Sequence, residues 1–321
     1  MTAVLTALVE RYLTERRRLG FQMRSDAYCL RSLAEHVGHT RHRGALTMEV
    51  MAEWARRDSR RSTDPRTWAR RLKKLRSFTR WLQQFEPATE VPDDSIFGRL
   101  PERQAPHIYS DEEVLQLLAA ARRLGPKPGL RGRVYETLFG LIASTGLRLS
   151  EALSLSVGDV DLRRGLLTIR RTKFAKSRHV PLHPSTHQAL RLYRRMRDLA
   201  GAERDDEAPF FIGTRGHLFG KTMSGRQVDR IFAALRVELG WVNRGMHHAP
   251  RVHDLRHTFV VRRICLWQRQ GVDIDEAMLS LSTYVGHAMV TNTYWYLQAV
   301  PELMAVAGRQ FESCMPENGH A

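Results

Sequence analysis

The stretch VHDLRHTF, residues 252–259, places two histidines and an arginine within one helical turn, next to apolar residues. Side chains three or four positions apart lie on the same face of a helix. His253 and His257, four apart, have the spacing at which two histidines bind a metal in the pattern His-Glu-x-x-His. His253 and Arg256, three apart, could instead face a phosphate together. The stretch alone leaves both interpretations open.

The chain around this turn is strongly basic. Among its 321 residues, 51 Lys and Arg stand against 34 Asp and Glu, which gives a formal net charge of +17. The parts before and after Pro106 are both basic, and this favours a polyanionic partner, such as nucleic acid, that the protein wraps. A solvated basic surface without a partner is the alternative. The length exceeds that of a typical single core and suits two domains.

The N-terminal stretch and the cysteines indicate a soluble, cytoplasmic protein. Residues 1–18 carry apolar residues at helical spacing with arginines after them, the reverse of a secretory signal, and no apolar run long enough for a membrane span follows. Cys29, Cys265 and Cys314 are widely spaced and form no metal-like pair. Neither a disulfide framework nor a zinc site is therefore expected.

Residues 1–86 predict a domain of short helices. Ser25 is expected to cap the second of them. The fourth is the clearest, because the pair Asp64-Pro65 combines a capping residue with proline at the first helical position. Its apolar residues share one side, and basic residues that include Arg71 and Lys74 lie largely on the other. That basic side is either a solvated face or a surface that lies along DNA phosphates.

Residues 87–107 contain four prolines among acidic and small residues and predict a linker. A second domain then begins, where Ser110 and Glu113 form a capping box. The pattern changes from helical to β-like between 160 and 182, where LLTIRRT and SRHVPL flank the residues KFAK, and this predicts a hairpin or an edge ribbon. The expected fold is mainly α with a small β-hairpin or sheet. Helices are expected over 131–144, 224–239, 252–269 and 275–284, with a last one from Pro301.

Four stretches, taken in order, resemble the motifs of one enzyme family. They are TGLRLSEALSL, TKFAKSRHVPL, HDLRHTF and VGHAMVTNTYWYL. Singly, each has an ordinary explanation, such as an ion pair, a surface lysine or an aromatic core. Together they closely resemble the arginine, lysine, His-x-x-Arg, Gly-His and tyrosine boxes of the tyrosine recombinases, the phage integrases and their relatives. The resemblance covers residues 108–304, and the helical first part is similar to the family's SAM-like core-binding domain, which binds DNA.

The resemblance implies a mixed α/β catalytic domain over 108–321 and a role for each matching residue. Arg148 and Arg256 correspond to the arginines that grip the scissile phosphate, and Lys173 to the lysine that protonates the leaving oxygen. His253 corresponds to the acid–base histidine, His287 to a second phosphate contact, and Glu151 to the acidic residue that supports the site.

Tyr296 matches the position of the nucleophile. Tyr294 competes for that role, but the spacing from His287 favours Tyr296. Val285, where leucine is usual, and Trp295, before the nucleophile, depart from the commonest pattern without removing a reacting group.

The chemistry of a phosphodiester explains these residue types. Displacement at phosphorus adds negative charge to the non-bridging oxygens, and two fixed guanidinium groups stabilise it through paired hydrogen bonds. Neither a metal nor another cofactor is therefore expected. A phenol with a pKa of about 10 must lose its proton as it attacks. The departing oxygen must gain one, and a lysine near Arg170 and Arg171 could donate it. A phosphotyrosyl link retains the ester's energy, so rejoining needs no ATP.

The resemblance implies a site-specific recombinase or integrase that acts as a homotetramer on double-stranded DNA through a 3′-phosphotyrosyl intermediate. The run TYWYLQAVPELM resembles recombinases of mobile elements, which favours integration or transposition over dimer resolution. The DNA target and any accessory protein are not indicated. A last helix with Leu303, Met304 and Val306 could pack on its own domain or on a neighbouring protomer.

Two rival functions remain at this point. A regulatory DNA-binding protein of the same fold would not need the reacting groups. A metal-dependent hydrolase would use His247, His248, His253 and His257, but no acidic ligand lies at the expected offset, and Arg256 would repel the ion.

Overall fold

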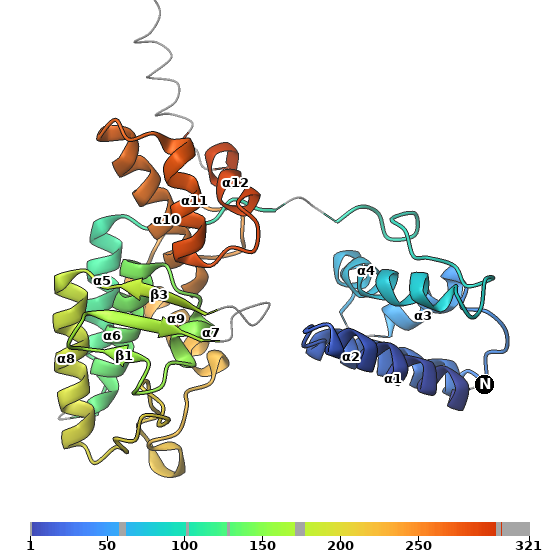
Figure 1. Ribbon diagram of the computed structural model, residues 1–321, viewed down its shortest axis with the longest axis horizontal. Helices are drawn as coiled ribbons and strands as arrows, with labels where there is room; N and C mark the ends of the chain where they lie inside the picture. The colour runs from blue at the N-terminus through green and yellow to red at the C-terminus, as the bar shows by residue number, and fades with distance from the viewer. Residues whose placement is uncertain are drawn as a thin grey trace, which may run out of the picture. The chain divides into compact units, whose positions relative to one another are not determined.

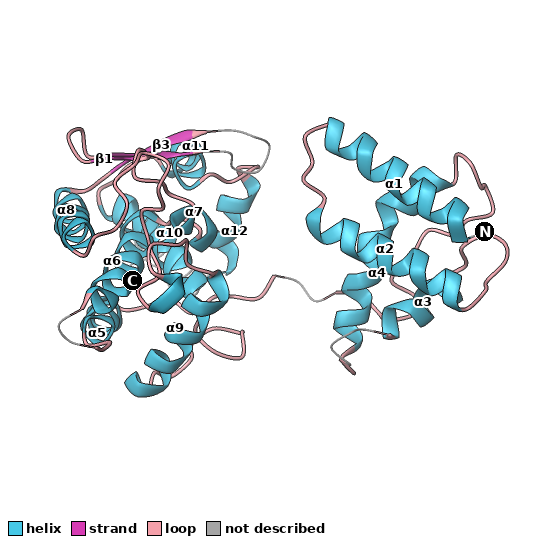
Figure 2. Ribbon diagram, turned by 90° about the horizontal axis from the view of Figure 1, so that it is seen from below, coloured by secondary structure: helices cyan, strands magenta, loops and turns pink. Residues whose placement is uncertain are grey.

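A computed structural model describes residues 2–57, 62–100, 103–126, 129–170, 177–299 and 303. The chain divides into two compact units, Met1–Arg103 and Gln104–Ala321. It is mainly helical with one small three-stranded sheet, which confirms the predicted fold class (Figures 1 and 2). In the described part of the chain, every helix is too short or too polar to span a bilayer.

The first unit consists of four helices around one core. They are α1 (Thr2–Arg18), α2 (Arg24–His39), α3 (Met48–Arg56) and α4 (Pro65–Leu82). Leu33, Met51, Leu75 and Phe78 are buried in the core that these helices share. Helix α4 begins as predicted, because the Asp64 side chain accepts a hydrogen bond from the backbone N–H of Arg66 at 2.9 Å.

The predicted cap of α2 is wrong. The residue before this helix is Met23, which has a left-handed φ of 50° and makes no side-chain capping bond. The hydroxyl of Ser25 instead accepts a hydrogen bond from the ammonium group of Lys74. Ser25 therefore connects α2 to α4 and does not cap the start of α2.

The segment predicted as a linker, 87–107, packs on the protein at both ends. On the side of the first unit, Arg76 Nε donates to the carbonyl of Pro92 at 2.7 Å, and the rings of Trp68 and Phe97 lie 5.4 Å apart. On the side of the second unit, the N–H of Met246 donates to the carbonyl of Ala105 at 2.9 Å. Much of this segment is thus part of one unit or the other.

The second unit is organised around α6 (Leu130–Thr145). Its mostly apolar sequence is buried, as expected, against α5 (Asp111–Arg122), α8 (Pro184–Leu199) and α10 (Val252–Arg269). Helix α6 ends at Gly146, which has a φ of 65°. A Cβ atom there would lie 2.5 Å from the ring of Phe259 on α10. Glycine thus permits both the turn and the close approach of α10.

The sheet of the second unit is antiparallel with the order β1-β2-β3. Its strands are β1 (Val160–Asp161), β2 (Leu166–Ile169) and β3 (Arg178–Pro181). Strands β2 and β3 are antiparallel neighbours, and Leu167 pairs with Val180. Strand β3 also contacts α11, at the edge of the unit where Figure 2 shows both elements. The remaining elements are α7 (Leu149–Leu153), the 3₁₀ helix η1 (Gly216–Leu218), α9 (Gly225–Leu239), α11 (Ile274–Val285) and α12 (Thr291–Ala299).

Candidate active site

Helix α10 carries VHDLRHTF and is held from one side by the residues that open the second unit. The N–H of Tyr109 donates to Thr258 Oγ1 at 2.9 Å, and the Tyr109 hydroxyl donates to the carbonyl of Arg251 at 3.0 Å. Arg262 Nη2 donates to the carbonyl of Tyr109 at 2.9 Å. Residues 251, 258 and 262 lie on one side of the helix, so its first three turns are fixed by backbone and side-chain bonds.

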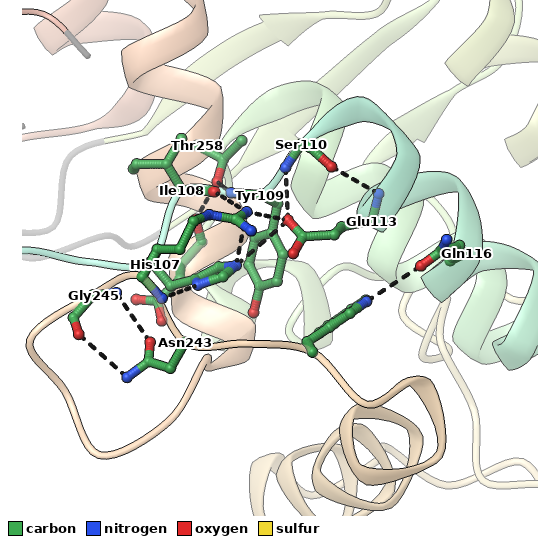
Figure 3. Close-up of polar contacts among 12 residues, drawn as sticks. His107, Ile108, Tyr109, Ser110, Glu113, Gln116, Asn243, Gly245 and Thr258 are labelled. Atoms are coloured by element: carbon green, nitrogen blue, oxygen red, sulfur yellow. Dashed lines mark hydrogen bonds and ion pairs between the residues drawn. The ribbon is translucent and has the colours of Figure 1, made fainter. Parts of the chain in front are cut away.

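A polar cluster extends this attachment to the loop before α10 (Figure 3). The ring of His107 accepts a hydrogen bond from the N–H of Arg244 at 3.1 Å, and the Arg244 guanidinium donates to the carboxylate of Glu113. Glu113 also completes the predicted capping box with Ser110. His107 is 1% exposed, and burial lowers its pKa, with a further contribution from Arg244 that Glu113 opposes. The imidazole of His107 is therefore neutral where residues 105–110 meet the loop before α10.

Arg256 lies on the other side of α10 and is almost fully buried, with 1% of its surface exposed. Its Nη1 donates to the carbonyl of Gly146 at 2.6 Å. Its Nη2 is buried and has no hydrogen-bond partner among the described residues. Burial and the nearby charge of Arg148 lower the pKa of Arg256 to about 10, so it remains a cation at neutral pH. A buried cationic donor with an unused N–H group is suited to an anion.

Arg148 precedes α7, and its N–H donates to Glu151 Oε2 at 3.0 Å, as in a capping box. The Arg148 guanidinium donates to Glu151 Oε1 at 2.7 Å and to the carbonyl of Gly286 at 2.8 Å. Burial alone would raise the pKa of Glu151, but hydrogen bonds and charge from Arg178 and Arg148 outweigh it and hold this pKa at about 2. Glu151 is thus an ionised anchor that fixes the Arg148 side chain.

Arg178, the first residue of β3, was not singled out from the sequence. It donates to both oxygens of Glu151, at 3.1 and 2.9 Å, and to the carbonyl of Tyr284 at 2.8 Å. It therefore joins the sheet to α7 and to the end of α11. Gly286 caps α11 with a φ of 70°, and a Cβ atom there would lie 2.5 Å from Arg178 Nη1. The glycine before His287 suits both this close approach and its left-handed backbone conformation.

His253 is exposed at the start of α10. Its ring meets the ring of His257 edge to face, with centroids 4.7 Å apart. Desolvation by the protein around it lowers the pKa of His253 to about 4, and the charges of Arg256 and Arg251 add to this effect. At neutral pH its imidazole is uncharged and could accept a proton.

Tyr296 is fully buried on α12, at 0% exposure, and its hydroxyl lies 2.5 Å from Nδ1 of His257. The ring of His287 stacks on Tyr296 at 6.4 Å, and its Nδ1 lies 2.7 Å from the hydroxyl of Thr293. In the sequence, His257 stood out for its metal-binding spacing to His253. The structure instead pairs its Nδ1 with the hydroxyl of Tyr296.

Tyr294, the competing tyrosine, lies elsewhere. Its hydroxyl donates to Asp275 Oδ1 at the start of α11, at 2.9 Å. That hydrogen bond raises the pKa of Tyr294. Among the two tyrosines, the arrangement of basic groups therefore favours Tyr296.

The remaining residues predicted from the sequence lie outside this cluster or outside the described residues. Lys173 falls in 171–176, which the structure does not describe. On α4, Arg71 stacks over the ring of Trp54 at 4.2 Å and donates to its carbonyl at 3.2 Å, while Lys74 binds Ser25. Among the described residues, no group of three or more His, Cys, Asp and Glu side chains is arranged to hold a metal ion.

Comparison with known proteins gives a family for the chain. The profile of the Phage integrase family matches residues 108–302. A protein of Sinorhizobium fredii (strain NBRC 101917 / NGR234) named as an integrase/recombinase, y4rB, is 36% identical over 310 residues, or 95% of this chain and 96% of that protein. Tyrosine recombinase XerC of Chlamydia trachomatis is 33% identical over 232 residues, or 72% of this chain and 66% of that protein.

Solved structures share the fold. The XerH site-specific recombinase bound to palindromic difH substrate has a TM-score of 0.63 at 17% identity, and the match covers 97% of this chain and 85% of that one. The Tn1549 transposon integrase in complex with transposon right end DNA has a TM-score of 0.62 at 17% identity, covering 94% and 99% of the two chains. Because the family profile spans more than half of the chain and the y4rB protein aligns along nearly all of it, the chain belongs to the phage integrase family of tyrosine recombinases.

Proposed function

We propose that this tyrosine recombinase cleaves and rejoins double-stranded DNA at a specific site, through a 3′-phosphotyrosyl intermediate and without a metal or ATP. The observation that carries the proposal is the buried Nη2 group of Arg256, which has no partner among the described residues. It belongs to a cluster of guanidinium groups, and a scissile phosphate would supply the acceptor that it needs.

Each predicted site residue then has a proposed role. Arg256 and Arg148 bind the non-bridging oxygens, and Glu151 and Arg178 hold Arg148 in place. His253, whose imidazole is neutral, and His287, whose ring contacts the Thr293 hydroxyl, line the phosphate site. Tyr296 attacks phosphorus, and Lys173 protonates the departing 5′ oxygen. The DNA backbone is a phosphodiester, so its cleavage has the same needs for charge stabilisation and proton transfer.

The first unit is proposed to bind the DNA duplex through the exposed side of α4. Arg71 and Lys74, which the sequence favoured for this role, are partly engaged within the unit. Exposed cations at helical spacing form a separate row on α4, which we call the α4 cationic row: Arg66, Arg70, Lys73 and Arg80. Within the described residues, none of these four side chains is in an ion pair, and a row of free cations is suited to phosphates.

Integration or transposition is the proposed biological reaction, with a homotetramer on two DNA sites as the working assembly. The support is the match along nearly the whole chain to a protein named as an integrase/recombinase, together with the resemblance of TYWYLQAVPELM to recombinases of mobile elements. A soluble cytoplasmic enzyme fits this reaction.

The test is covalent capture on nicked duplexes made from the DNA that flanks the gene. A nick next to the scissile phosphate lets the leaving fragment diffuse away, so a denaturing gel shows the protein–DNA adduct. Wild type and Tyr294→Phe are expected to form the adduct, and Tyr296→Phe to form none. An adduct in both single variants would identify another nucleophile. Intact DNA-dependent function in Tyr296→Phe would instead support a regulatory DNA-binding protein.

A further inference from the structure

We propose that His257, rather than His253, is the catalytic base that takes the proton of Tyr296 when this tyrosine attacks DNA. This inference rests on the proposed cleavage reaction and assigns one of its proton transfers to a residue for which the sequence suggested no catalytic part. The contact between His257 Nδ1 and the Tyr296 hydroxyl carries it.

The geometry separates the two histidines. A base must lie within hydrogen-bonding distance of the proton that it removes, and His257 Nδ1 is 2.5 Å from the Tyr296 oxygen. Among the described contacts, the ring of His253 touches the ring of His257, at a centroid distance of 4.7 Å, and does not touch the Tyr296 hydroxyl. His253 is exposed and is suited to meet the DNA, whereas His257 is suited to meet the tyrosine.

Burial strengthens this assignment. His257 is 5% exposed and Tyr296 is 0% exposed, so solvent is not in place to accept the phenolic proton. The neighbouring imidazole of His287 is directed to another group, since its Nδ1 lies 2.7 Å from the Thr293 hydroxyl. A phenol with a pKa of about 10 gains most from a neighbouring base at neutral pH.

The position of His257 is fixed by the helix that carries it. Residues 254–261 of α10 are buried, and the Thr258 hydroxyl donates to the carbonyl of Asp254 at 2.9 Å while it accepts from the N–H of Tyr109. The backbone that carries His257 is therefore held in place beside the tyrosine. A fixed base of this kind needs no reorganisation at the moment of reaction.

The proposed step is balanced in atoms and charge. The Tyr296 oxygen forms a bond to phosphorus, the bond from phosphorus to the 5′ oxygen breaks, and the phenolic proton moves to Nδ1 of His257. The leaving oxygen takes its proton from Lys173. In the rejoining step the 5′ hydroxyl gives its proton to Lys173 as its oxygen bonds to phosphorus, the bond from phosphorus to the Tyr296 oxygen breaks, and His257 returns its proton to the departing phenolate. This requires the tautomer of His257 with its proton on Nε2 in the resting enzyme.

His257→Asn tests the proposal, because its amide oxygen can accept the tyrosine's hydrogen bond but is not basic. Single-turnover adduct formation on the nicked duplex is measured between pH 6 and pH 10. At pH 7 the rate should fall about 10²- to 10⁴-fold. The rate should then rise with pH as free phenolate forms, so that the difference from wild type narrows towards pH 10. Fluorinated tyrosine at position 296, a more acidic phenol, should restore part of the lost rate.

A substrate with sulfur in place of the 5′ bridging oxygen separates the two proton transfers, because a thiolate can leave without gaining a proton. It should restore cleavage to Lys173→Ala but not to His257→Asn. His257→Gln serves as a second variant if the asparagine variant does not fold, as judged by circular dichroism and DNA binding.

Two results would overturn the assignment. A wild-type rate and pH profile in both His257 variants would show that the residue only packs against the tyrosine. Faster cleavage would show that His257 restrains Tyr296 instead of activating it. Failure of the wild-type protein to form any adduct would contradict the proposed function itself, and so is distinct from both.

Discussion

Replacing Glu151 by Gln should destabilise the second unit in a manner that depends on pH. The Glu151 carboxylate accepts hydrogen bonds from Arg148 and Arg178 in a buried position. Its pKa is about 2 in the folded protein against an ordinary value of 4.5, and this difference corresponds to about 3 kcal/mol of stability from the ionised group. Because folding lowers the pKa, this stabilisation is complete above pH 4.5 and is lost as the pH falls towards 2.

The assay is hydrogen exchange of the full-length protein, with peptides from each unit followed by mass spectrometry, so that the two units report separately. At pH 7, Glu151→Gln should lower the free energy of unfolding of the second unit by about 3 kcal/mol. The difference from wild type should shrink in urea titrations carried out at pH 3. Peptides of the first unit should be unchanged.

Glu136→Gln is the matched control. Glu136 also pairs with two arginines, Arg122 and Arg133, but their side chains are 59% and 33% exposed. Its replacement should cost no more than about 1 kcal/mol at either pH. If Glu151→Gln costs no more than this control, or if its effect is the same at pH 3 and pH 7, the ionised-anchor reasoning is wrong.

Three further predictions concern the phosphate site and α4. Arg256→Lys should slow adduct formation about 10²- to 10³-fold with DNA binding retained, because a point charge cannot reproduce the guanidinium fork; undiminished cleavage would contradict the phosphate contact. Gly286→Ala should also slow cleavage, since its Cβ would displace Arg178; a wild-type rate would mean that the contact yields freely. Arg70→Ala should reduce the slope of log affinity against log salt concentration by about one, whereas Arg71→Ala should change it less and weaken the first unit through the lost stacking on tryptophan. Equal slopes for the two variants would contradict the α4 cationic row.

Helix positions were readable from the sequence because their signals are local. The Asp64-Pro65 start of α4 and the Ser110–Glu113 capping box were both predicted, and the structure confirms each. The cap of α2 failed because a contact distant in the chain prevailed: Ser25 binds Lys74, and a left-handed Met23 starts the helix. Local propensity contained no sign of that partner.

In the site, too, contacts between residues close in the chain were predictable, and contacts between distant residues were not. The pairing of Arg148 with Glu151 follows from their spacing of three, and the structure confirms it. Arg178 and His257 were missed as site residues because their partners lie 27 and 39 positions away, respectively. One signal was available, since both residues fall inside stretches that had already been recognised, SRHVPL and LRHTF. Which of several polar residues in such a stretch faces the reacting group depends on helix rotation and strand register, which only the assembled fold fixes.

The attachment of residues 105–110 to α10 has a consequence for anyone who cuts the chain into parts. A fragment that starts at Asp111, the first residue of α5, would lose Tyr109 and His107, and with them the bonds to Arg251, Thr258 and Arg244. Even the family boundary at residue 108 excludes that histidine. Chimeras that exchange DNA-binding units between recombinases should therefore be joined before Gln104, so that α10 and the loop before it keep their hydrogen bonds to residues 105–110.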